Sequence, residues 1–226
     1  MSALPASVIV LPSVCAAGFL LGWTCDHVVP RLLPTVGFRR GAGIRSVTAA
    51  ALAALFLAMV LRFGLDSKLA AYLLFAVSAV VLSRIDLQSK LLPNAVVFPT
   101  FWLGAILLAF DAILHQTWSS LLRAGIGAAL LFLIYLVLAV ISPAGLGMGD
   151  VKLAGIIGMF SAYLGWPVLF IAGTLGFLLG GVVGVFLLLV RRAKGSTEFP
   201  FGPSMLAATI VAIAGSEVFA PLFFAA

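Results

Sequence analysis

Two aspartates, Asp86 and Asp150, stand out in a chain that has only seven acidic residues. Asp150 lies in GLGMGDVKLAG (145–155), between glycines and a lysine, and Asp86 lies in RIDLQSKLLPN (84–94). Two carboxyl groups, one ionised and one protonated, can take a proton from water and polarise a peptide carbonyl, which is aspartyl-protease chemistry. Because adjacent carboxylates cannot both ionise, we expect this pair to share one proton.

The residues around Asp150 and Asp86 suit such a site. A Gly-x-Gly-Asp turn, with Gly147 and Gly149, permits close approach of a peptide backbone and gives the chain access to positive φ. The positive end of the helix that follows Asp150 would favour its charge, whereas Asp86 follows the negative end of a helix. We therefore expect Asp86 to act as the acid and Asp150 as the base.

The elements that must position these side chains are strongly apolar. The 226-residue chain is 64% hydrophobic and 9% charged, with a mean hydropathy of +1.28, whereas about a quarter of a soluble globule is charged. This composition predicts a membrane protein in contact with the lipid bilayer. The net charge is +6, but the basic residues are scattered among apolar runs, so we expect no nucleic-acid partner. Since no polar linker divides the chain, residues 1–226 are expected to form a single transmembrane domain.

Eight apolar stretches approach the roughly 20 residues that a helix needs to cross a bilayer. They predict an all-α fold, a polytopic bundle of about eight transmembrane helices. The sixth stretch is short and follows the glycine-rich segment, as expected for a helix that begins below the membrane boundary. The expected spans are 6–24, 46–63, 68–84, 95–114, 120–142, 151–164, 167–190 and 203–224.

The basic residues between these spans predict the orientation, because Lys and Arg accumulate in cytoplasmic loops. With the N-terminus outside, three basic residues lie outside: Arg62, Lys68 and Arg123. The other ten lie in the cytoplasm: Arg31, Arg39, Arg40, Arg45, Arg84, Lys90, Lys152, Arg191, Arg192 and Lys194. This bias predicts that both termini are outside and that both aspartates face the cytoplasm.

The two aspartate segments carry a family resemblance. GMGDVKLAG, with the upstream DLQSKLLPN, resembles the paired motifs of the type IV prepilin peptidases, which are GxGD-type intramembrane aspartyl proteases. GFLLGWTCDHVVPRL (18–32) is similar to that family's first helix, and FPFGPSMLA (199–207) resembles its Pro-Phe-Gly-Pro entry into the last helix. The resemblance covers nearly the whole chain and implies that Asp86 and Asp150 form the catalytic dyad.

This resemblance implies a membrane endopeptidase that removes the basic leader from prepilin or pseudopilin-like precursors at the cytoplasmic face. The enzyme would be a multi-pass protein of the plasma (inner) membrane of a prokaryote and would use no metal, nucleotide or other cofactor. Its partners would be a prepilin-like membrane protein and the bilayer. The residues expected to shape the loops or contact the substrate are Gly147, Gly149, Lys152, Lys90, Pro93, Asn94, Gly202 and Pro203.

One departure concerns the first cytoplasmic loop. Larger members of the family carry two CxxC pairs there, interpreted as a zinc site, and also N-methylate the new N-terminus of the product. This chain has only Cys15 and Cys25, and residues 25–45 offer only Cys25, Asp26 and His27 as ligands, fewer than the four that a structural zinc site uses. We therefore expect neither a metal site nor a disulfide, and we assign the peptidase reaction without the methyltransferase reaction.

Other interpretations remain open from sequence alone. Asp86 would be an ordinary solvated residue if it simply paired with Lys90 at i+4, and Asp150 would be an N-cap of the sixth span. A proton-coupled transporter also uses intramembrane carboxylates, but it would carry acids near mid-span and broken repeats, and neither is seen. A GxGD protease with other membrane substrates and a purely structural subunit are further alternatives.

Overall fold

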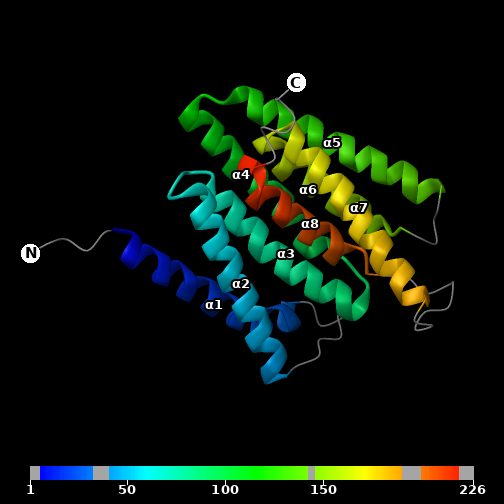
Figure 1. Cartoon of the computed structure of the whole chain (residues 1–226), viewed down its shortest axis with the longest axis horizontal. Coiled ribbons are helices and arrows are strands. Elements are labelled where there is room, and N and C mark those ends of the chain that lie inside the picture. The colour runs from blue at the N-terminus through cyan, green and yellow to red at the C-terminus, as the bar shows by residue number, and fades with distance from the viewer. Residues whose placement is uncertain (1–5, 33–40, 142–145, 190–199, 219–226) are drawn as a thin grey trace, which may run out of the picture.

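Every regular element among the residues described by the computed structural model (6–32, 41–141, 146–189 and 200–218) is an α-helix (Figure 1). Four of these helices, α2 to α5, are long and apolar enough to cross a membrane, and shorter apolar helical segments accompany them. The all-α class is thus confirmed for the described residues, with four candidate membrane-spanning helices. The elements are α1 (Ala6–Leu32), α2 (Ala42–Phe63), α3 (Leu69–Ser89), α4 (Asn94–His115), α5 (Trp118–Ile141), α6 (Met148–Leu164), α7 (Trp166–Leu189) and α8 (Gly202–Ala214).

The centre of the bundle is formed by α3, α6 and α8. The short α8 contacts α3, α6 and α7, while α1 packs on α2 at one edge and α5 packs on α6 at the other (Figure 1). Apart from Lys152, every residue of α6 from Val151 to Tyr163 is buried. A helix that is apolar on all sides belongs in a core, and Asp150, in its first turn, is half-buried at one end of that core.

Two glycines allow α6 to lie directly against α5. A Cβ atom added to Gly158 of α6 would lie 2.1 Å from the carbonyl oxygen of Gly127 of α5. Small residues let helix backbones approach closely in membranes, where van der Waals packing drives association. The position of α6 is therefore determined by backbone contact as well as by side-chain packing.

Several helices extend beyond their predicted bounds, and two of these differences affect the aspartates. Helix α3 continues to Ser89 instead of residue 84, and α6 begins at Met148 instead of residue 151. Both aspartates consequently lie inside helices, whereas the sequence predicted that they lie in loops. The reason is that Ile85 and Asp86 are buried in the bundle, so tertiary packing maintains one more turn of α3.

The first and last spans also differ from their predicted bounds. Helix α1 runs to Leu32 instead of residue 24, and Cys25 packs against Val81 and Ile85 of α3. The expected loop at residues 25–32 is therefore helical. Helix α8 ends at Ala214, next to Gly215, and residues 216–218 are helical again, while residues 219–224 of that predicted span lie outside the described residues.

Candidate active site

Asp86 lies in the last turn of α3 with only 4% of its surface exposed. Its Oδ2 accepts a hydrogen bond from the backbone N–H of Gly202, at 3.0 Å. The alternative of a solvated Asp86 paired with Lys90 is wrong. Lys90 ends α3 in the left-handed conformation (φ 53°), and its backbone N–H bonds to the carbonyl oxygen of Asp86 at 2.8 Å while its side chain is exposed.

Asp150 occupies the first turn of α6. Its Oδ2 accepts a hydrogen bond from the backbone N–H of Gly147, at 3.2 Å. Gly147 is the N-cap residue, so the interpretation of Asp150 itself as the N-cap is wrong by three positions. The other oxygen, Oδ1, is buried and has no hydrogen-bond partner among the described residues. A buried oxygen of this kind normally has a partner, so Oδ1 is available to a substrate or to water.

The start of α8 lies between the helix ends that carry the two aspartates. A Cβ atom on Gly202 would lie 2.9 Å from Asp86 Oδ2 and 3.6 Å from Cδ2 of Leu153, which is one turn beyond Asp150. The two carboxyl groups are close enough to interact electrostatically. Gly202 thus lies between the last turn of α3 and the first turns of α6, and a larger residue there would require Asp86 or the start of α8 to shift.

Both carboxyl groups face the N-terminal end of a helix. Asp150 lies at the start of α6, as expected, while Asp86 accepts the amide of the first residue of α8. Positive helix ends stabilise negative charge. The prediction that Asp86 is the acid and Asp150 the base rested only on the ends of α3 and α6. Helix α8 adds a positive end beside Asp86 that the sequence did not reveal.

An aromatic group positions the start of α8. The ring centroid of Phe201 lies 6.4 Å from that of Tyr135 on α5 and 6.1 Å from that of Phe177 on α7. The Phe201 ring also packs against Gly180 of α7. Tyr135 is buried and close enough to Asp150 to interact with it electrostatically. Tyr135 was not predicted from the sequence, because an aromatic residue within an apolar span gives no local sign of such a contact.

The glycine-rich segment meets the segment that follows α3. A Cβ atom on Gly149 would lie 2.9 Å from Cβ of Leu92, so a glycine is needed for this close approach. Neither glycine has a positive φ, because Gly147 has φ −79° and Gly149 lies within α6. That part of the prediction is wrong, because α6 begins before Gly149 and gives it helical geometry.

The other predicted residues divide into two groups. Lys152 Nζ donates to Asn94 Oδ1 at 2.8 Å and lies 5.6 Å from the ring centroid of Phe98, which ties α6 to the start of α4. Pro93 is the N-cap residue of α4, and Pro203 lies in the first turn of α8, so both begin helices beside the aspartates. Lys90, at the end of α3, is exposed.

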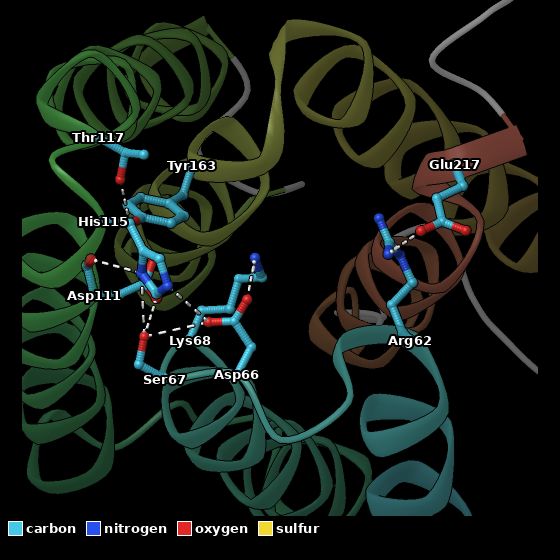
Figure 2. A network of polar contacts seen from close by, with 9 residues as sticks. All are labelled: Arg62, Asp66, Ser67, Lys68, Asp111, His115, Thr117, Tyr163 and Glu217. Atoms are coloured by element: carbon cyan, nitrogen blue, oxygen red, sulfur yellow. Dashed lines mark hydrogen bonds and ion pairs between the residues drawn. The ribbon is translucent and has the colours of Figure 1, made fainter.

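A second polar cluster lies at the opposite end of α3 (Figure 2). Asp111 of α4 accepts hydrogen bonds from the hydroxyl of Ser67 and, at 2.5 Å, from the hydroxyl of Tyr163, and His115 Nδ1 lies 3.2 Å from its Oδ1. Asp66 pairs with Lys68 at 2.8 Å. Hydrogen bonding to the Lys68 ammonium is the main cause that lowers the pKa of Asp66.

The acids at this end had no partner motif in the sequence, yet each one has partners in the structure. Ligand atoms of Asp66, Asp111 and His115 lie within 4.8 Å of one another, a spacing that would suit a metal ion. However, Lys68 already neutralises Asp66, and hydroxyl groups occupy both oxygens of Asp111. This cluster therefore joins α3, α4 and α6 structurally.

Comparison with known proteins identifies the family. Residues 73–185, half of the chain, match the type IV leader peptidase family, and both Asp86 and Asp150 lie within the match. The chain belongs to this family. Gly202 and Pro203 lie beyond the matched residues, so their place beside the aspartates comes from the structure.

Three curated relatives are each named prepilin leader peptidase/N-methyltransferase. The protein of Pseudomonas putida is 36% identical over 165 residues, covering 70% of this chain and 54% of the relative. That of Stutzerimonas stutzeri is 32% identical, covering 67% and 51%, and that of Bacillus subtilis is 31% identical, covering 71% and 61%. The chain matches about half the length of the first two relatives. No solved structure gives a significant match.

Proposed function

We propose that this protein is a membrane aspartyl endopeptidase that removes the leader peptide from prepilin or pseudopilin-like precursors. The observation that supports the proposal is that Asp86 of α3 and Asp150 of α6 are close enough to interact electrostatically, with the buried Oδ1 of Asp150 left without a partner in the described residues. The family match and the printed names of the relatives support the same reaction.

In the proposed reaction one carboxylate takes a proton from water while the other, protonated, donates a hydrogen bond to the scissile carbonyl oxygen. The water oxygen attacks the carbonyl carbon and gives a tetrahedral intermediate. Breakage of the C–N bond transfers a proton to the leaving amine and regenerates the carboxyl pair with one shared proton. No covalent bond to the enzyme forms, and the proposal assigns no metal or cofactor to this step.

We further propose a single domain with about eight membrane crossings, both termini outside, in the inner membrane of a prokaryote. The dyad would then face the cytoplasm. Support comes from the basic residues, because Arg84, Lys90 and Lys152 lie at the dyad end of the bundle whereas Arg62 and Lys68 lie at the opposite end of α3. Several other basic residues used in the prediction, Arg39, Arg40, Arg191, Arg192 and Lys194, lie outside the described residues.

The transporter alternative is not favoured, because the family match and the names of the relatives point to a peptidase. The relatives' names also include N-methyltransferase. Our proposal for this chain covers the peptidase reaction alone.

The decisive experiment compares wild type with Asp86→Asn and Asp150→Asn. Each purified protein is incubated in detergent with a pilin-like precursor, and the release of the leader is followed by electrophoresis and mass spectrometry. We expect cleavage by wild type and none by either variant. Cleavage by both variants would overturn the dyad, and a wild type that cuts no such precursor would overturn the proposed function.

A further inference from the structure

Tyr135 of α5 is a buried tyrosine whose hydroxyl group has no hydrogen-bond partner in the part of the chain that the structure describes. The chain has three tyrosines, and none of them is more than 5% exposed. The Tyr72 hydroxyl donates to the carbonyl oxygen of Phe160 at 2.9 Å, and the Tyr163 hydroxyl donates to Asp111. A buried tyrosine hydroxyl normally has such a partner. The Tyr135 hydroxyl is therefore available to a bound substrate.

The packing of α5 on α6 places Tyr135 level with the start of α6. The two helices are antiparallel, and the backbones of Gly127 and Gly158 meet where they pack (Figure 1). Tyr135 lies eight residues after Gly127 in α5, and Asp150 lies eight residues before Gly158 in α6. Eight residues span roughly 12 Å in either helix. Gly127, Leu131 and Tyr135 lie one turn apart, and both Leu131 and Tyr135 are buried. The register therefore brings Tyr135 and Asp150 to the same depth.

Two further relations connect Tyr135 with the proposed dyad. Tyr135 is close enough to Asp150 to interact with it electrostatically, and its ring centroid lies 6.4 Å from that of Phe201. Phe201 directly precedes Gly202, whose amide donates to Asp86. Oδ1 of Asp150 is also buried without a partner among the described residues. Two unsatisfied polar groups, a hydroxyl donor and a carboxyl acceptor, thus lie at one depth on neighbouring helices.

We propose that the Tyr135 hydroxyl is a third catalytic group, which donates a hydrogen bond to the tetrahedral intermediate formed beside Asp150. The inference rests on the proposed function, because it adds one residue to that reaction. The former carbonyl oxygen becomes more negative as the intermediate forms, so a fixed hydroxyl donor stabilises the intermediate more than the substrate. The hydroxyl keeps its own proton throughout, since the two aspartates transfer the protons. The competing role for Tyr135 is packing of its ring against Phe201 alone.

Tyr135→Phe removes the hydroxyl and keeps the ring that packs on Phe201. We expect kcat for a pilin-like precursor to fall by roughly 10- to 100-fold, with KM within about twofold of wild type and no fall in the thermal unfolding midpoint. The matched control is Tyr72→Phe, which removes a buried hydroxyl 14 residues before Asp86 in α3, roughly 20 Å away along the helix. It should lower the unfolding midpoint and leave kcat unchanged. A Tyr135→Phe protein with the kcat of wild type, or an equal fall in kcat in both variants, would overturn the inference.

A binding experiment separates this inference from the proposed function. The probe is a peptide that spans the leader junction and carries a secondary alcohol in place of the scissile carbonyl group, so that it resembles the tetrahedral intermediate. Its affinity is measured by calorimetry in detergent. Tyr135→Phe should bind the probe about tenfold or more weakly than wild type, whereas Tyr72→Phe should bind it as wild type does.

The two possible failures of this experiment are distinct. If wild type cleaves the precursor and Tyr135→Phe binds the probe as tightly as wild type, the hydroxyl has no catalytic role and the peptidase assignment stands. If wild type neither cleaves the precursor nor binds the probe, the peptidase assignment fails, and the role of Tyr135 fails with it.

Discussion

Aspartates lie at both ends of α3, but the hydrogen bonds to their carboxyl oxygens differ. At one end, hydroxyl groups occupy both oxygens of Asp111, and His115 lies beside it (Figure 2). At the other end, Asp150 receives a single amide hydrogen bond and leaves Oδ1 without a partner among the residues described. A polar network with every group satisfied makes the fold more rigid, whereas an unsatisfied buried oxygen is costly unless something binds it. Under the proposed function, the first end stabilises the fold and the second end carries out the reaction.

The largest expected effect comes from making the same substitution at both ends. Asp150→Asn should lower the cleavage rate by roughly 10²- to 10⁴-fold or more, because a carboxyl group that transfers protons is lost, while the thermal unfolding midpoint should stay near that of wild type. Asp111→Asn should leave the rate per folded molecule unchanged and lower the free energy of unfolding by about 1–3 kcal/mol. Cleavage assays and thermal unfolding in detergent measure both quantities, and the reverse pattern would refute the comparison.

Gly202→Ala sharpens the assignment at the dyad end. The new Cβ atom would lie 2.9 Å from Asp86 Oδ2, so either Asp86 or the start of α8 must move. A displacement of about 1 Å can reduce a rate by roughly 10²-fold, and we expect a loss of about 10- to 100-fold in kcat. Gly43→Ala, where a Cβ atom meets nothing within 4 Å, is the control. A variant at position 202 as active as that control would show that Gly202 does not position Asp86.

Tyr163→Phe tests whether the polar cluster around Asp111 has a structural role. The substitution removes the hydroxyl that donates to Asp111 Oδ2 at 2.5 Å, and the free energy of unfolding should fall by about 1–3 kcal/mol without a change in kcat. Thr117→Val, whose hydroxyl lies 3.4 Å from that of Tyr163, should have a smaller effect. Chemical unfolding and cleavage kinetics on the same samples provide the check, and a selective loss of kcat would contradict a structural role.

The smallest effect concerns the pair Asp66 and Lys68. Because hydrogen bonding to Lys68 lowers the pKa of Asp66 in the folded state, the pair stabilises the protein above the unfolded pKa of about 3.9. That contribution is lost as pH falls through the lowered folded pKa. For a partly exposed pair it should be under about 1 kcal/mol. The difference in unfolding midpoint between wild type and Lys68→Met should therefore narrow below about pH 4, and a difference independent of pH would refute the prediction.

The sequence predicted the class of protein and pointed to Asp86 and Asp150 as the candidate catalytic pair, because both predictions depend on local properties. Long apolar runs specify membrane helices wherever they occur, and the Gly-x-Gly-Asp stretch identifies Asp150 within a few residues. The same local signals predicted the helix ends poorly at Asp86, since only contacts with other helices extend α3 to Ser89.

Apolar patterning and the positions of a few charged residues by themselves determined the bundle of helices and the candidate dyad. Tertiary structure alone decided the hydrogen bond from Gly202 to Asp86, which joins residues 116 positions apart. It also decided the hydrogen bonds that two hydroxyl groups donate to Asp111. The packing of α5 on α6, which places Tyr135 level with Asp150, is likewise a tertiary feature. The physical reason is that membrane partition acts on each segment separately, whereas these features arise from close packing between segments that share no local pattern.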